Sequence, residues 1–403
     1  MGVKAERRLL YVRNHVHPQS HRYHHSQSRR DFFRSLVGGA LTGASILELA
    51  WHRAAWARAA RVPTADPQLF DIEKVAEGVY CALARAQAEI NSNAAIFVNS
   101  SDVLVVDTHS KPSAAASLIA QINKEITPHP VRYVVNTHFH WDHIQGSHAY
   151  RADGGKIDFI ASEPTKQLMS EFAQQRLQAS LDEIPKQIDA LRVRAGKSSS
   201  ADEKAFCEEQ IRQMLAYQSE MKTFTLELPT ITLDKSYLIK DEAHELHIEF
   251  HGHAHTAGDV VVFCPQKRVV ATGDMIHGFL PFIRDGFPKT WPKTMDSVAQ
   301  LGFDKICPGH GPVQQSQERL IDMRNYIEEL TEKVEAGKKA GQSIAELQKT
   351  ITVASLKSMQ SNGYSKYVSD NQYKYTPNFG SPAPLQDGVN TNIADVCNNL
   401  ERV

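Results

Sequence analysis

The feature that most constrains this chain is a run of seven residues, Thr137-His138-Phe139-His140-Trp141-Asp142-His143. Four metal-binding side chains fall within six positions, directly behind the apolar segment 131–135. Zinc prefers imidazole nitrogens and carboxylates as ligands, and a hydrophobic core has no use for such a pattern. Alternate residues of an extended turn can point two histidines at one ion, which leaves Asp142 and His143 to face a second position. The run therefore predicts a metal site, with a solvated polar loop as the alternative.

Three later segments repeat the arrangement of an apolar strand that ends in a ligand-type side chain. His255 lies in a glycine-flanked loop, Asp274 follows the apolar run 269–273, and His310 stands in a Pro-Gly-His-Gly turn. The carboxyl ends of strands are where open α/β layers usually place their sites. We therefore expect these three side chains to complete the metal site.

Other histidines near His255 receive different expectations. His251 and His253 are expected at a strand end or on the surface, and His244 and His247 at exposed strand positions. His277 opens an aromatic segment that begins three residues beyond Asp274. Because Asp274 must point at the metals, this segment is expected at the rim of the site, where His277 contacts substrate or serves as a catalytic group. A solvated turn residue is the alternative for His277.

The first 59 residues read as a targeting segment. A basic leader precedes Ser28-Arg29-Arg30-Asp31-Phe32-Phe33, an apolar run covers 36–47, and Ala57-Arg58-Ala59 offers a small-x-small cleavage site. The segment resembles a twin-arginine signal peptide, which implies export to the periplasm or secretion. Charged residues end the apolar run early, so we expect no stable membrane span in the mature protein. An uncleaved membrane anchor is the alternative.

Cysteine usage and net charge exclude several classes of protein. The five cysteines are widely spaced and form no C-x-x-C motif, so no obligatory disulfide is expected. A formal net charge of −1 leaves no electrostatic footprint for nucleic acid. A small-molecule substrate is therefore expected, and the oligomeric state stays open, a dimer included.

The remaining chain alternates strands and helices in three regions. Strands are expected over 70–107 and a helix from Pro112, before the strand 131–135. Residues 163–223 read as a helical insertion with breaks at Pro185 and at 196–200; its apolar stripe packs onto the domain or forms a lid or dimer contact. The third region, 315–403, is expected to hold helices over 315–337 and 343–359. A tyrosine-rich surface loop over 360–387 then follows, whose tyrosines line a substrate groove or pack the loop.

Together these motifs resemble the metallo-β-lactamase-fold hydrolase superfamily. The resemblance covers 70–313, and it implies an α/β protein, an αββα four-layer sandwich over 60–314 that carries the helical insertion. It also implies that one zinc ion is bound by His138, His140 and His255 and a second by Asp142, His143 and His310, with Asp274 bridging both. Asp107 matches the buried acid that supports the histidine loop in this family.

The ligand set implies the chemistry of a hydrolase. Two zinc ions can share a hydroxide at neutral pH, and this nucleophile would attack an ester, lactone, thioester or amide carbonyl. Asp274 stands where true β-lactamases usually carry Cys or Ser, and this departure resembles glyoxalase II and lactonases. The alternatives are a true β-lactamase, an iron-dependent redox enzyme like persulfide dioxygenases, and a non-catalytic binding protein. Iron or manganese is an alternative to zinc.

Overall fold

The computed structural model of the protein describes residues 69–152, 156–222, 224–375 and 384–402. The expected signal peptide, residues 1–59, lies outside this part of the chain. None of the helices in the described ranges is long and apolar enough to cross a membrane.

Seven strands form the first sheet, and they lie side by side in chain order. The first four pair antiparallel, and the pairs from β4 onwards are parallel. Short alternating or apolar runs such as Val103–Val106 account for these strands, because one or both of their faces are buried. The strands are β1 (Phe70–Ala76), β2 (Val79–Ala84), β3 (Ala94–Val98), β4 (Val103–Val106), β5 (Val131–Val135), β6 (Asp158–Ser162) and β7 (Ile231–Leu233).

Five strands form the second sheet in the order β12-β11-β10-β9-β8. β8, β9, β10 and β11 pair antiparallel, whereas β11 and β12 run parallel, so both of these strands end at the same edge. Between β10 and β11 lies the short 3₁₀ turn η2 (Pro265–Lys267). The strands are β8 (Ser236–Lys240), β9 (Glu245–Phe250), β10 (Val260–Cys264), β11 (Val269–Gly273) and β12 (Lys305–Pro308).

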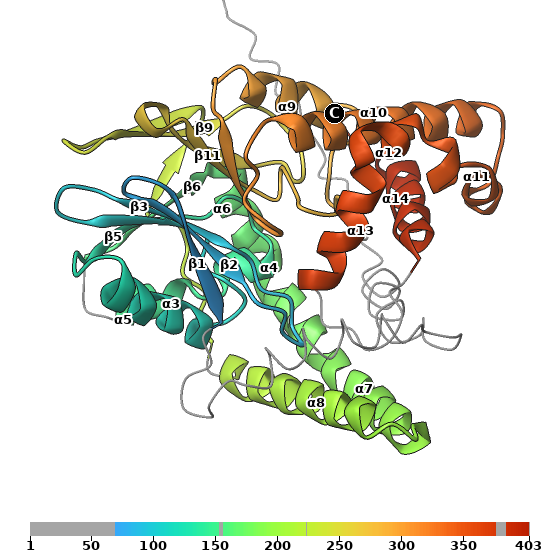
Figure 1. Cartoon of the computed structure of the whole chain (residues 1–403), viewed down its shortest axis with the longest axis horizontal. Coiled ribbons are helices and arrows are strands. Elements are labelled where there is room, and N and C mark those ends of the chain that lie inside the picture. The colour runs from blue at the N-terminus through green and yellow to red at the C-terminus, as the bar shows by residue number, and fades with distance from the viewer. Residues whose placement is uncertain (1–68, 153–155, 223, 376–383, 403) are drawn as a thin grey trace, which may run out of the picture.

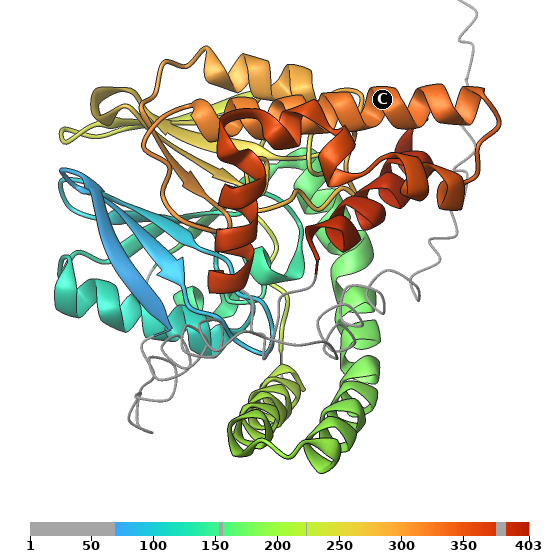
Figure 2. The same ribbon diagram turned by 45° about the vertical axis from the view of Figure 1, so that its right-hand side comes forward.

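Three apolar clusters hold the layers together. Side chains from both sheets, such as Leu104 and Ile248, form the cluster between the sheets. Helices α3 (Pro112–Glu125) and α5 (Ser147–Ala152) cover the outer face of the first sheet. Helices α9 (Trp291–Ala299) and α10 (Glu318–Lys339) cover the second (Figure 1). Figure 2 shows the two sheets as separate layers, which confirms the expected αββα sandwich.

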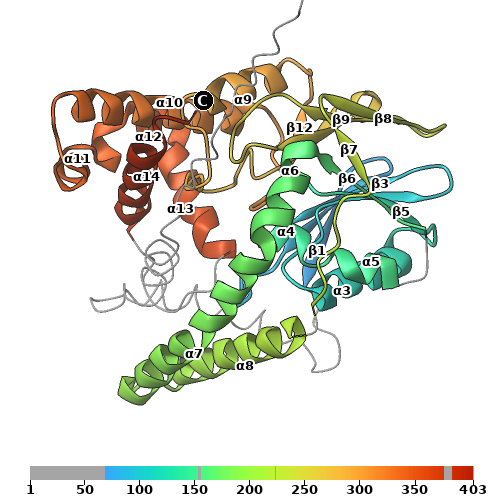
Figure 3. The ribbon, with the colours of Figure 1, turned by 180° about the vertical axis from the view of Figure 1, so that it is seen from behind.

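Residues 163–197 and 201–221 are helical and include a long hairpin that extends away from the sheets (Figure 3). The break expected at 196–200 is present at 198–200. The hairpin has its own apolar cluster, in which Ile188 of one helix packs with Met214 of the other. The break expected at Pro185 is wrong, because α7 continues through this proline and its apolar contacts outweigh one lost backbone hydrogen bond. Its elements are α6 (Glu163–Leu168), the π-helix η1 (Met169–Ala173), α7 (Gln174–Lys197) and α8 (Ala201–Met221).

The C-terminal region contains more helix than the sequence suggested. The expected loop 360–387 is wrong where α13 stands, because Tyr364 and Val368, one helical turn apart, are buried in the cluster beside α10. Tyr367 packs against the same cluster, which agrees with the expectation that these tyrosines pack this segment onto the surface. The expected helix 343–359 is divided at Ile351, which is extended. The elements are α11 (Ile344–Thr350), η3 (Val353–Ser355), α12 (Lys357–Gln360), η4 (Ser361–Gly363), α13 (Tyr364–Tyr375) and α14 (Leu385–Asn399).

All five cysteines are buried and free. Cys307 lies on β12, as expected for a buried strand residue.

Candidate metal centre

Four strand ends meet at one edge of the sandwich and carry the predicted ligands. The histidine run follows β5 and enters the short helix α4 (Trp141–Ile144), which holds Asp142 and His143. His255 follows β9, Asp274 follows β11 directly, and His310 follows β12. The parallel pairing of β11 and β12 brings the last two together.

The structure brings all seven predicted ligands into two adjacent, buried groups. Within each group, one ligand atom of every residue lies within 4.8 Å of the others. These groups match the division expected from the sequence. The first group is His138, His140, His255 and Asp274, and the second is Asp142, His143 and His310.

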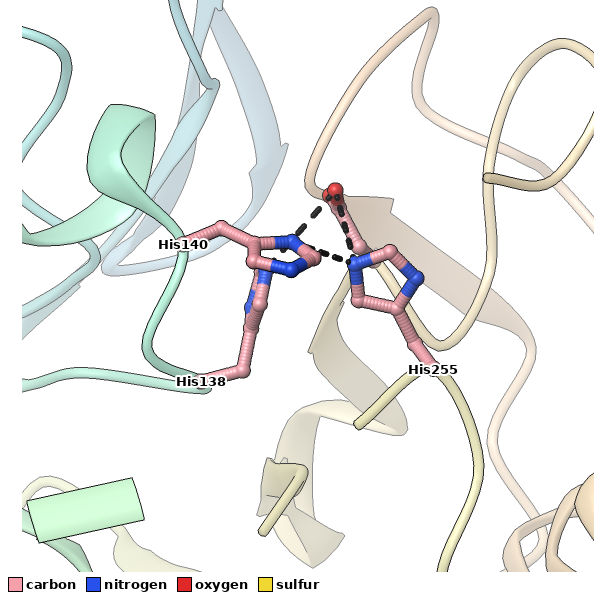
Figure 4. Close-up of side chains that lie close together, drawn as sticks. His138, His140 and His255 are labelled. Carbon is pink, nitrogen blue, oxygen red and sulfur yellow. Dashed lines mark hydrogen bonds and ion pairs between the residues drawn. The ribbon is translucent and has the colours of Figure 1, made fainter. Parts of the chain in front are cut away.

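Imidazole nitrogens face one another inside each group. Nδ1 of His140 lies 2.8 Å from Nε2 of His255, and Nε2 of His143 lies 3.3 Å from Nε2 of His310 (Figure 4 shows the first pair). Neutral imidazole has one donor and one acceptor nitrogen, and the acceptor is the atom that binds a metal. Nitrogens that converge on one point are therefore suited to share a cation.

Asp274 lies between the two groups. Its Oδ2 is 3.6 Å from Nε2 of His255 and 3.8 Å from Nε2 of His138. Its Oδ1 is 3.3 Å from Nε2 of His143 and 3.5 Å from Nε2 of His310. Each carboxylate oxygen thus faces one group, which is the arrangement that a bridging ligand requires.

The outward nitrogens of several ligands are held by neighbouring groups. Nδ1 of His143 lies 2.8 Å from Asp107, which also accepts from the backbone N–H of Thr137 at 2.8 Å. Nδ1 of His255 lies 3.0 Å from the carbonyl oxygen of Phe282, and Nε2 of His140 lies 2.8 Å from Asp285. Such hydrogen bonds fix the ring orientation and keep the inward nitrogen available to a metal.

Asp107 has a left-handed backbone conformation, with φ of 68°. A non-glycine residue in this region is strained, and such strain persists where the surrounding structure requires it. Its carboxylate contacts both Thr137 and His143, so the strained residue connects the end of β4 to the histidine run.

The donor set fits divalent metal ions. Nε2 of His138 is buried and has no hydrogen-bond partner among the described residues. Burial and the neighbouring imidazoles hold the pKa values of His138 and His255 well below the ordinary value, which favours the neutral, metal-binding form. A Cβ on Gly309 would lie 2.1 Å from Oδ1 of Asp274, so only glycine allows this close approach.

The second group attracts positive charge. Burial opposes the charged imidazole, but the nearby carboxylates, led by Asp274, outweigh burial and hold the pKa of His143 well above its ordinary value. The same balance raises the pKa of His310 to about 9. A site that favours protonated imidazoles in this way has a negative potential, which a divalent cation would neutralise.

His277 lies beside the metal groups. Its Nε2 is 3.4 Å from Oδ2 of Asp274, and neither ring nitrogen has a hydrogen-bond partner among the described residues. The side chain is buried, so the alternative of a solvated turn residue is wrong. The aromatic rings that follow are half-buried. The ring centroid of Phe279 lies 5.3 Å from that of His277, and the ring centroid of Phe282 lies 5.6 Å from that of His140.

The four histidines that precede or flank His255 in the sequence, from His244 to His253, stay outside both groups. His251 and His253 are half-buried beyond the end of β9, and His247 is half-buried on β9. His244 is buried, so its expected exposure is wrong. Its Nε2 lies 3.1 Å from Oδ1 of Asn99, and this polar contact compensates for the loss of water.

Two further residues near the centre could not be recognised from the sequence. Asp285 contacts His140 but stands 145 positions away from it, in an irregular segment. Arg176, on α7, forms two hydrogen bonds to Asp285. Neither residue belongs to a motif, so only the folded arrangement reveals their place.

A family model described as "Metallo-beta-lactamase superfamily" matches residues 89–310, more than half of the chain. The chain belongs to the metallo-beta-lactamase superfamily. The matched range contains all seven side chains of the two groups, and it ends at His310.

One relative in this superfamily is the linear primary-alkylsulfatase of Pseudomonas sp. (strain ATCC 19151), 25% identical over 239 residues. This match covers 55% of the chain and 42% of the relative, so the chain spans less than half of that protein. Two solved metallo-beta-lactamases are similar to this chain in structure. The metallo-beta-lactamase from Pontibacter korlensis has a TM-score of 0.46 and 19% identity, and the match covers 62% of this chain and 95% of the Pontibacter chain. That from Hirschia baltica has a TM-score of 0.46 and 19% identity, with 64% and 97% covered.

Proposed function

We propose that the chain is a hydrolase that works with two zinc ions. The observation that carries this proposal is the position of Asp274, whose two carboxylate oxygens face two separate groups of imidazoles. The first group would hold one ion and the second group the other, with Asp274 shared. Bound zinc supplies an activated water at neutral pH and polarises the bond to be cleaved.

The protein's own residues keep the two groups in place. Asp107 and Asp285 hold the rings of His143 and His140, so these ligands need no reorientation during the reaction. The half-buried rings of Phe279 and Phe282 lie against His310 and His140, and we expect them to limit the access of bulk water at this rim. The substrates that we propose are esters, lactones, thioesters or amides with apolar groups that these rings can contact.

His277 is proposed to contact the substrate. Its unpartnered ring nitrogens lie beside Asp274, where a polar substrate atom would accept or donate a hydrogen bond. We expect His277→Ala to lower kcat/KM by about 10- to 1000-fold, the range for loss of one polar transition-state contact. Elemental analysis should show unchanged metal content. Activity within about twofold of wild type, or loss of metal, would contradict this role.

Hydrolysis of sulfate esters is a second candidate function. The alkylsulfatase relative shares 25% identity with the chain over 239 residues, and this observation supports a sulfate ester as the alternative to an acyl substrate. The two candidates differ in the bond that is cleaved, because a sulfate ester presents a charged sulfuryl group where an acyl ester presents a carbonyl.

One set of substrates with a common chromophore separates these reactions. We would compare p-nitrophenyl butyrate with p-nitrophenyl sulfate on zinc-loaded protein, and add a chromogenic β-lactam, a lactone and a thioester. The proposal expects the acyl substrates to be cleaved faster than the sulfate by at least tenfold in kcat/KM. Faster cleavage of the sulfate would establish the second candidate, and preferential cleavage of the β-lactam would identify a true β-lactamase. No cleavage of any member would contradict the proposed hydrolase.

A further inference from the structure

We propose that Arg176 is a positioning residue for the first metal group, so that the helical hairpin supports the metal centre through Asp285. Arg176 would hold Asp285, and Asp285 would in turn fix the ring of His140. This inference rests on the proposed function only in that the first group binds a metal ion.

The contacts form a continuous path from α7 to the ligand. Nη1 of Arg176 donates to Oδ2 of Asp285 at 2.8 Å and Nη2 donates to Oδ1 at 2.9 Å. This two-bond geometry fixes the plane of the carboxylate, which a single contact would leave free to rotate. The same Oδ2 lies 2.8 Å from Nε2 of His140. The other nitrogen of His140, Nδ1, therefore faces His255 and the first group.

Arg176 also contacts the histidine run itself. Its guanidinium lies over the ring of Phe139, 4.6 Å from the centroid. Phe139 stands between His138 and His140 in the sequence, and its side chain is buried. One arginine thus restrains both the backbone segment that carries two ligands and the carboxylate that orients one of them.

The segment that carries Asp285 is held from a second side. The side-chain amide of Asn399, at the end of α14, donates to the carbonyl oxygens of Ile283 at 2.7 Å and Arg284 at 2.9 Å. Asp285 is therefore fixed between the hairpin and the C-terminal helix. Since burial also keeps water from this carboxylate, loss of Arg176 would leave a buried acid without its charge partner.

The chain offers a close control in Arg194, which is on the same helix. Its Nε lies 2.7 Å from Glu203 and its guanidinium lies 5.9 Å from the ring of Phe206, within the hairpin. Both arginines are thus half-buried, paired with a carboxylate and stacked on a phenylalanine, but only Arg176 leads to a ligand. Loss of general stability should affect the two variants alike.

The experiment measures zinc affinity of the full chain by competition with a chelator, for wild type, Arg176→Met, Arg176→Lys and Arg194→Met. We expect Arg176→Met to lower the affinity for one of the two zinc ions by about 10- to 100-fold, the usual effect of losing a ligand's supporting partner. The other ion should change by less than about threefold. Arg176→Lys keeps the positive charge but cannot form both hydrogen bonds to Asp285, so its zinc affinity should lie between those of wild type and Arg176→Met. Arg194→Met should have the zinc affinity of wild type.

Three results would overturn the inference: unchanged affinity in Arg176→Met, equal weakening of both ions, or the same loss in Arg194→Met. If Arg176→Met does not fold by circular dichroism, Asp285→Asn takes its place. Asp285→Asn must lower the affinity for only one of the two zinc ions, and unchanged affinity for both would overturn the inference. A wild-type protein that binds two ions but cleaves no substrate would contradict the proposed function alone.

Discussion

The ligands of the metal centre depend on single polar contacts that lie behind them. Asp107 holds His143, Asp285 holds His140 and a backbone oxygen holds His255. Each contact selects which ring nitrogen carries the proton, and so decides which nitrogen can bind a metal. At the scale of residues, the chemistry of this site is therefore set as much by these partners as by the ligands.

Another buried acid, Asp395 on α14, shows how burial changes the pKa of a carboxyl group. Burial raises its pKa to about 7, although Arg284 opposes the shift. Because the folded pKa lies above the ordinary value of 3.8, stability from this group is present at low pH and is lost as the pH rises towards 7. Each pKa unit corresponds to about 1.4 kcal/mol, so the loss is at most about 4 kcal/mol.

We therefore expect Asp395→Asn, which cannot ionise, to gain stability relative to wild type as the pH rises. Urea unfolding at pH 5 and pH 8 should show the gain increase by about 1 to 3 kcal/mol between the two values. A difference between variant and wild type that does not change with pH would show that Asp395 is not held protonated by its surroundings.

Among the elements, the parallel strands β11 and β12 meet at two glycines, Gly273 at the end of β11 and Gly309 directly after β12. Gly309 donates its N–H to the carbonyl oxygen of Gly273 at 2.8 Å, and this contact sets Asp274 beside His310. A Cβ on Gly309 would lie 2.8 Å from the backbone of Gly273 as well as close to Asp274. The strand ends would have to separate to accept it.

We expect Gly309→Ala to lose at least one of the two metal ions and to lower kcat/KM by more than tenfold. Its free energy of unfolding should fall by about 1 to 3 kcal/mol, the usual effect of overpacking. Gly196→Ala is the control, because nothing lies within 4 Å of the added Cβ and alanine favours the helix. Two ions and normal activity in Gly309→Ala would show that the close approach is not needed.

The strand ends were predictable from the sequence for a physical reason. Asp274 or His310 alone could be an ordinary turn residue at a strand end, but both follow apolar runs and come after the histidine run, so together they could be identified without a structure. Asp285 and Arg176 could not, because they meet only through the packing of α7 on the domain. The same holds for α13, whose polar sequence reads as a loop until Tyr364 is seen to be buried.

In the whole molecule, the helical hairpin and the C-terminal helices are two additions to the sandwich, and both contact the segment 283–285. The hairpin reaches it through Arg176 and the C-terminal helix through Asn399, and Asp285 lies between them. Both additions should therefore contribute to tight binding of metal in the first group.

For export of the whole protein, we propose the twin-arginine route, which carries folded proteins. Replacing Arg29 and Arg30 by lysine should leave folded, active protein in the cytoplasm. The same change at Arg7 and Arg8, far from the apolar run, should leave export intact. Fractionation of cells that contain the twin-arginine transporter would decide this, and undiminished periplasmic protein in the Arg29 and Arg30 variant would contradict the proposal.

If two zinc ions share Asp274, the metal content of the purified protein must reveal both of them. Elemental analysis should find two zinc ions per chain in wild type and in the control His251→Ala, whose imidazole contacts Glu249 and Ser297 instead. Asp142→Ala and His310→Ala, both in the second group, should retain at most one tightly bound ion. One ion in wild type with no change in His310→Ala, or iron in place of zinc, would contradict the claim.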